Sequence, residues 1–161
     1  MRRPIRLVPL SLLVILAACG EQPAAPPANG GTTAAAPAPA SDLTPWQLAH
    51  GIGPITEPVP LAPVDAKEAH EGKELFDVKC GACHKGDERY VGPALGGVVD
   101  RRGPEYVMNM ALNPGEMIRR HPEAKKLFAT FLVEMPNQGL SPEQARRVVE
   151  YLRTLPAPPA K

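Results

Sequence analysis

Residues 80–84 constrain this chain more than any other stretch, because they read Cys-Gly-Ala-Cys-His. This spacing is that of the covalent attachment sequence for c-type haem. Two thiols three residues apart at a helix end can reach the two vinyl groups on one porphyrin edge. The next side chain then points its imidazole at the iron. The motif therefore predicts one covalent haem c, with thioethers at Cys80 and Cys83 and with His84 as the proximal iron ligand.

Two other kinds of site could use a Cys-x-x-Cys pair. A thioredoxin-like dithiol requires a strand followed by a helix, and no segment of this chain alternates long enough to form a strand. A structural zinc site requires two further ligands at comparable spacing, whereas the remaining histidines are scattered. Covalent haem is therefore the favoured interpretation.

Proline content divides the chain. It has 161 residues and 21 prolines, many of them between Pro23 and Pro63, so that stretch does not belong to a packed core. What remains, residues 65–156, is a small domain followed by a tail at 157–161. Aromatic residues make up 4% of the chain, which leaves a thin core. A domain of this size usually needs a disulfide, a metal or a cofactor, and a buried porphyrin would supply the missing apolar mass.

Residues 1–18 are predicted to be an export signal, with three arginines ahead of an apolar stretch too short to span a bilayer comfortably. Residues 16–19 read Leu-Ala-Ala-Cys and resemble the lipobox of bacterial lipoproteins. That resemblance implies lipidation of Cys19 as the first residue of the mature chain. The alternative is a plain signal peptide with Cys19 incidental. We expect an exported, membrane-anchored lipoprotein that faces the periplasm.

The next two segments differ in composition. Residues 19–41 are rich in alanine, proline and glycine, which predicts a disordered tether. In residues 42–64, Thr44 is a capping residue, a proline follows it, and Gln47 stands three positions after the cap. This pattern predicts a short helix ending near Gly51. The only tryptophan lies here, so the segment either docks on the main domain or is a solvated linker.

Four helices are expected in residues 65–156, which makes the domain all-α. Apolar residues recur there at helical spacing, and prolines or capping residues mark the helix starts. The expected helices cover residues 68–79, 104–112, 122–133 and 142–155.

Further motifs in this domain resemble those of class I cytochromes c, in the same order along the chain. They are Gly72 and Phe76 (Gly-x-x-x-aromatic), residues 92–95 (Gly-Pro-Ala-Leu), Met135-Pro136 and Tyr151-Leu152. The resemblance covers residues 65–156 and implies the class I cytochrome c fold, with about four helices wrapped around one covalent haem. It also implies that the carbonyl of Pro93 accepts the second imidazole N–H, and that Arg101 or Arg102 pairs with a haem propionate.

The resemblance implies Met135 as the sixth iron ligand, and its position in a loop between two helices agrees. Met117, expected in a turn, and His50, in the segment that may dock, are the alternatives, together with an open site. A thioether ligand raises the potential. Two fixed ligands also leave no position for substrate or oxygen, which favours an electron carrier over an enzyme.

Charge excludes one class of partner. The formal net charge is +1, and three of the 18 basic residues lie in the export signal, which leaves 15 against 17 acidic residues. A nucleic-acid binder would be strongly basic.

We therefore expect a monomeric carrier between a quinol-oxidising complex and a terminal reductase or oxidase. Residues 106–138 are similar to small cytochromes accompanying nitrous-oxide and other anaerobic respiratory reductases. A haem-based ligand sensor and a structural haem subunit of an oxidoreductase are the alternatives.

Overall fold

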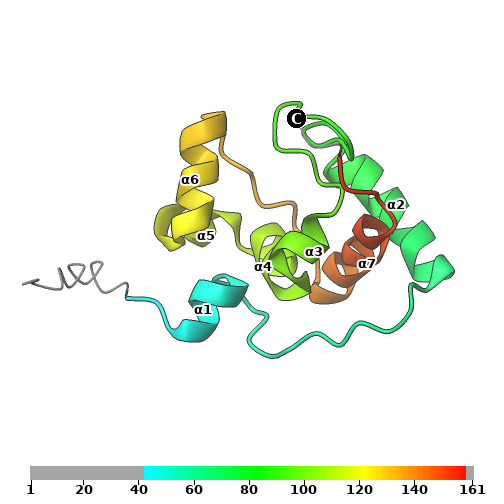
Figure 1. Ribbon diagram of the computed structural model, residues 1–161, viewed down its shortest axis with the longest axis horizontal. Coiled ribbons are helices and arrows are strands. Elements are labelled where there is room, and N and C mark those ends of the chain that lie inside the picture. The colour runs from blue at the N-terminus through cyan, green and yellow to red at the C-terminus, as the bar shows by residue number, and fades with distance from the viewer. Residues whose placement is uncertain (1–41, 159–161) are drawn as a thin grey trace, which may run out of the picture. The chain divides into compact units, whose positions relative to one another are not determined.

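The computed structural model describes residues 42–158 and contains seven helices in that range (Figure 1). They are α1 (Pro45–His50), α2 (Ala66–Lys79), α3 (Val98–Arg102), α4 (Pro104–Leu112), α5 (Pro114–Arg120), α6 (Pro122–Phe131) and α7 (Pro142–Arg153). No strand occurs within 42–158, which confirms the all-α class. Within residues 42–158, none of the helices has the length and hydropathy that a membrane span requires. The expected export signal, Cys19 and the tether lie outside the described residues.

Local chemistry at the helix starts explains why these segments are helical. Five of the seven helices begin with proline, which loses no hydrogen bond at that position. Thr44 with Gln47 and Ser141 with Gln144 form complete capping boxes. Asp65 accepts hydrogen bonds from two backbone N–H groups of α2. The expected short helix at Thr44 and the expected starts of α4, α6 and α7 are therefore observed.

Helix ends and two short helices differ from the sequence prediction. Helix α6 ends at Phe131 because Leu132 adopts a left-handed conformation with φ 56°, and α7 ends at Arg153. Helices α3 and α5 were not expected, and Met117 lies within α5 instead of in a turn. Both helices are too short to show a periodic apolar stripe.

The first core is formed by α2, α3, α4 and α7. Gly72 allows the close crossing of α2 and α7, because a Cβ there would overlap the carbonyl oxygen of Arg147. One turn later Phe76 packs on Tyr151, with ring centroids 5.2 Å apart. The buried members of this core are Phe76, Val99, Met108, Ala145, Val148, Val149 and Leu152.

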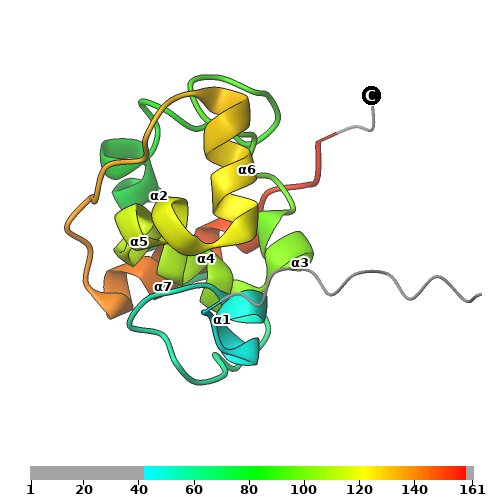
Figure 2. The ribbon, with the colours of Figure 1, turned by 90° about the vertical axis from the view of Figure 1, so that its left-hand side faces the viewer.

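A second core joins residues 42–64 to α4, α5 and α6. Its buried members are Leu43, Ile52, Tyr106, Met117 and Ala124. The sequence left open whether this segment docks, and the structure shows that it does: after α1 it runs along the lower edge of the domain to α2 (Figure 1). Figure 2, turned by 90°, shows α1 below α4 and α5.

Candidate haem site

A cavity of about 390 Å³ lies between the end of α2, the segment that follows it, α4, α6 and the loop before α7. Its walls are mostly apolar. The expected haem-binding, iron-ligating and supporting residues line this one cavity, namely Cys80, Cys83, His84, Pro93, Arg101 and Met135. The fold thus gathers segments that are far apart in the chain around one apolar space.

The cysteines enter the cavity through a tight turn that continues α2. The backbone N–H of Cys80 donates to the carbonyl of Phe76 at 2.8 Å, and those of Cys83 and His84 donate to the carbonyl of Cys80 at 3.0 and 2.9 Å. Burial raises the pKa of the Cys80 thiol to about 11, and the charge of Cys83 adds to the rise. The free thiol is therefore neutral at pH 7 and puts no charge into the apolar cavity.

His84 is held from two sides. Its Nδ1 lies 3.0 Å from the carbonyl oxygen of Pro93. Burial lowers the pKa of His84, and the Pro93 carbonyl opposes this shift without overcoming it. A neutral imidazole that donates from Nδ1 leaves Nε2 as a free lone pair, which is the form that ligates a metal.

Gly92 completes the seat of this imidazole. A Cβ at position 92 would lie 2.5 Å from Cε1 of His84, so the ring rests directly on glycine backbone. The surrounding segment is cross-linked by backbone hydrogen bonds: Gly92 N–H to Cys83 C=O at 2.8 Å, and Gly96 N–H to Gly86 C=O at 2.7 Å. The His84 side of the cavity is therefore rigidly built.

The Met135 side is held more loosely. Met135 is partly buried in the segment between α6 and α7, most of which is exposed. Among the described residues, one hydrogen bond ties residues 132–140 to a distant element, from the Asn137 side-chain amide to the carbonyl of Leu112 at 3.1 Å. The others are local to the segment.

The two alternative sixth ligands lie outside the cavity. Met117 is fully buried in the second core, and its Sδ accepts the backbone N–H of Ile52 at 3.0 Å. His50 stacks on Trp46 with ring centroids 4.0 Å apart, and its Nδ1 lies 3.3 Å from a carboxylate oxygen of Glu105. Neither residue lines the cavity.

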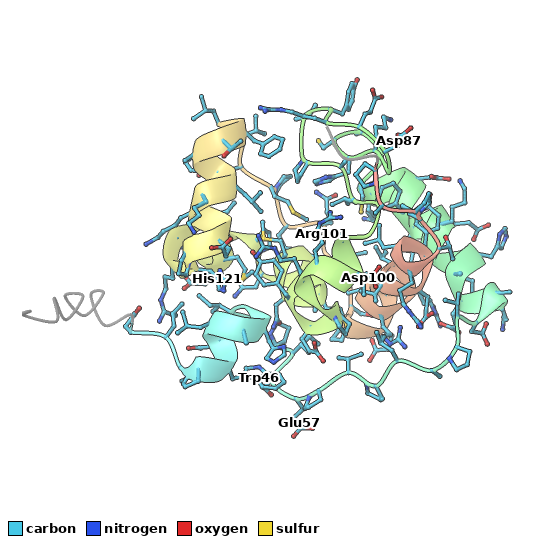
Figure 3. All side chains as sticks on the ribbon, in the orientation of Figure 1. Trp46, Glu57, Asp87, Asp100, Arg101 and His121 are labelled. Atoms are coloured by element: carbon cyan, nitrogen blue, oxygen red, sulfur yellow. The ribbon has the colours of Figure 1, made fainter. Side chains whose placement is uncertain are left out.

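One buried polar group in the cavity wall shows that the space fits a haem. Tyr106 lines the cavity, and its hydroxyl is buried with no hydrogen-bond partner among the described residues. Arg101 and Arg102 also line it, and Figure 3 shows Arg101 near the centre of the domain. Mostly apolar walls that include a tyrosine and two arginines suit a porphyrin that carries two carboxylates.

One residue of this polar wall, Tyr106, was not predicted from the sequence. The guanidinium of Arg101 donates to the carbonyl of Gly96 at 2.7 Å. Arg102 pairs with Glu123 at 3.0 Å and lies over the ring of Tyr106. Tyr106 itself was not singled out, because an aromatic residue in the first turn of a helix carries no local sign of its burial.

The sequence profile that describes cytochrome c matches residues 69–156. The chain belongs to the cytochrome c family. A solved structure of cytochrome c from Rhodothermus marinus is 48% identical to this cytochrome, with a TM-score of 0.65, and the match covers 70% of this chain and 97% of that chain. No curated protein matches the chain.

Two engineered forms of the Rhodothermus marinus cytochrome c are also similar, each over 70% of this chain and 97% of theirs. One, Rma TDE, is 47% identical with a TM-score of 0.64. The other is described as Rma TDE bound to a carbene intermediate, and is 48% identical with a TM-score of 0.62. Membership of the family confirms the expected cofactor, covalent haem c, and haem-based electron transfer as the general function.

Proposed function

We propose that this cytochrome c is a membrane-tethered, monomeric carrier that passes single electrons from a quinol-oxidising complex to a terminal reductase or oxidase. The observation that carries the proposal is that His84 and Met135 line the same cavity, whereas Met117 and His50 do not. An imidazole and a thioether give two protein ligands to one iron, which leaves no position for a substrate.

This proposed function requires only electron transfer from the chain. In each cycle it accepts one electron from the donor complex and delivers one electron to the acceptor, with no bond made or broken and no proton taken up. Two cycles consume the two electrons of one quinol. The thioether of Met135 favours ferrous iron and so raises the potential toward that of terminal acceptors.

The mouth of the cavity supports exchange with protein partners. Val91, Phe128 and Val133 line the cavity and keep 38%, 37% and 50% of their surface exposed. Large apolar side chains at an open rim are typical of a contact surface. By resemblance of residues 106–138, the acceptor class is an anaerobic respiratory reductase of the kind that nitrous-oxide reductase represents.

Membrane attachment is proposed from the lipobox-like residues 16–19 and the composition of residues 19–41. Several acyl chains on Cys19 would anchor durably, and a coil of this length reaches roughly 25 Å. The domain would then sample the periplasmic membrane surface where its partners lie. Cys19→Ser should move the protein into the soluble fraction with its haem intact, and retention in the membrane would contradict the anchor.

The deciding experiment on the carrier function is carbon monoxide added to the reduced, haem-loaded protein at neutral pH. Inertness, together with a far-red iron–sulfur absorption band in the ferric protein, is the expected result. Rapid and complete binding would contradict the carrier proposal and favour a ligand sensor. Size-exclusion chromatography of the anchor-free protein should show a monomer, whereas a stable complex would favour a structural subunit.

A further inference from the structure

Residues 42–64 precede the 69–156 matched by the family profile, yet they contribute to the support of the cavity. Helix α6, whose residues Ala124, Leu127 and Phe128 line the cavity, packs chiefly on α5, and α5 in turn packs on α4 and α6. The second core, to which residues 42–64 contribute Leu43 and Ile52, lies behind this helix pair. The α5–α6 wall therefore depends on that segment for its packing.

The first polar link joins α5 to this segment. The fully buried Sδ of Met117 accepts the backbone N–H of Ile52 at 3.0 Å. The side-chain amide of Asn113, which precedes α5, donates to the carbonyl of Ile52 at 3.2 Å. Both backbone groups of Ile52 are thus satisfied by the wall that it packs against.

The second link is His121, at the junction of α5 and α6. Its Nδ1 accepts the backbone N–H of Glu123 at 3.2 Å and so caps α6. Its Nε2 lies 3.2 Å from the carbonyl oxygen of Leu48 in α1, so Nε2 carries the proton. The imidazole ring also packs edge-on against Tyr106, with centroids 5.2 Å apart. Figure 3 shows His121 beside α5 and directly above α1.

Helix α4 receives the same segment on its outer face. Asn109 accepts from the N–H of Ile55 at 3.0 Å and donates to the carbonyls of His50 and Ile55 at 3.0 and 2.9 Å. A Glu105 carboxylate oxygen accepts the N–H of Val59 at 2.7 Å. The cavity lies against other residues of this helix, among them Tyr106 and Met110.

We propose that residues 42–64 form a brace that holds the α5–α6 wall against the haem cavity, and that Met117 and His121 are its positioning residues. The loosely tied loop of Met135 begins where α6 ends. A wall that moves outward would carry this loop with it and admit outside ligands to the iron. The brace thus keeps the sixth position closed, an inference that rests on the carrier function proposed above.

Two conservative variants of the haem-loaded mature protein test the brace. His121→Asn keeps an acceptor that caps α6 but is too short to reach the carbonyl of Leu48. Met117→Leu conserves volume and removes the sulfur acceptor of Ile52. Losing one buried hydrogen bond shifts an opening equilibrium roughly fivefold. Each variant should therefore bind carbon monoxide about fivefold faster than the slow residual rate of the unaltered protein, with both reduced proteins followed optically over hours after mixing.

Val149→Ala is the matched control. Val149 is fully buried in the first core and does not line the cavity, so its truncation destabilises the fold without touching the brace. Thermal unfolding of all three variants relates the carbon monoxide rate to stability. An equal rise in rate for Val149→Ala at equal loss of stability would overturn the positioning role. If His121→Asn fails to incorporate haem, Met117→Leu decides.

The two proposals fail in different ways. Rapid carbon monoxide binding by the unaltered protein would contradict the carrier function itself. An inert unaltered protein whose brace variants are equally inert would leave the carrier function standing and overturn the brace alone.

Discussion

Nδ1 of His84 lies 3.0 Å from the carbonyl oxygen of Pro93, nine positions further along the chain. The same loop presents Gly92 to the face of the imidazole ring, where a Cβ would lie 2.5 Å from Cε1. One short segment therefore sets both the tautomer and the tilt of the proposed proximal ligand, and it is cross-linked to the Cys-x-x-Cys turn by the Gly92–Cys83 hydrogen bond.

Gly92→Ala should displace the imidazole, because the new methyl group occupies the space of the ring. Overpacking of this kind costs about 1–3 kcal/mol, so we expect a lower thermal midpoint and a shifted reduction potential. Gly115→Ala is the control, since its Cβ would meet only the flexible end of Arg119. Equal midpoints for the two variants would show that the glycine is not needed for the ring.

Met135→Ala should abolish the far-red iron–sulfur band of the ferric protein and lower the reduction potential, because a soft neutral ligand that favours ferrous iron is lost. Optical spectroscopy and redox titration measure the two effects. Met108→Leu should keep the band, since that thioether is buried in the first core and does not line the cavity. A band that survives in Met135→Ala would assign the ligand to another residue.

Tyr106→Phe tests whether the buried hydroxyl contacts a haem carboxylate. A hydroxyl with no partner is costly to bury. If the hydroxyl does not contact the haem, the substitution should therefore leave the free energy of unfolding unchanged or raise it. We expect the opposite in the haem-loaded protein, a loss of about 1–2 kcal/mol, because a hydrogen bond to a charged acceptor disappears. Thermal or guanidinium unfolding of the holoprotein measures whether the free energy of unfolding falls or rises.

Asn109→Ala should release the docked segment from α4. Three hydrogen bonds to backbone groups at positions 50 and 55 are lost, and we expect a destabilisation of about 3 kcal/mol. Limited proteolysis should then cleave between residues 53 and 64. Asn113→Ala, which loses one bond to Ile52, should have a smaller effect, and equal effects would contradict the ranking.

Glu123 should contribute to acid sensitivity. Hydrogen bonds from Lys126 and Arg102 lower its pKa below the ordinary value of 4.5. A depressed pKa means that the stabilisation is present above that value and is lost as the pH falls through the folded pKa. Glu123→Gln should therefore flatten the fall of the thermal midpoint below pH 4.5. Glu57 is an exposed carboxylate on the docked segment (Figure 3). Glu57→Gln makes the same charge change and should not flatten the fall of the thermal midpoint.

Local patterns determined much of this protein from sequence alone. The Cys-x-x-Cys-His spacing predicts the cofactor, and the prolines and caps predict where α1, α4, α6 and α7 begin, because each effect acts within one helical turn. The same residues could not reveal α3 or α5. Helices of five and seven residues have no apolar period to detect, and their stability comes from tertiary packing.

Only the tertiary structure decided which polar and sulfur-bearing residues face the cavity. By sequence, Met135 was the favoured sixth ligand, and Met117 and His50 stayed open as alternatives. Hydrogen bonds and packing across more than 50 positions hold Met117 and His50 outside the cavity. The burial of Tyr106 and the docking of residues 42–64 depend on the same long-range contacts. Such contacts form only when the chain has folded and water has left the second core, so a local pattern carries no record of them.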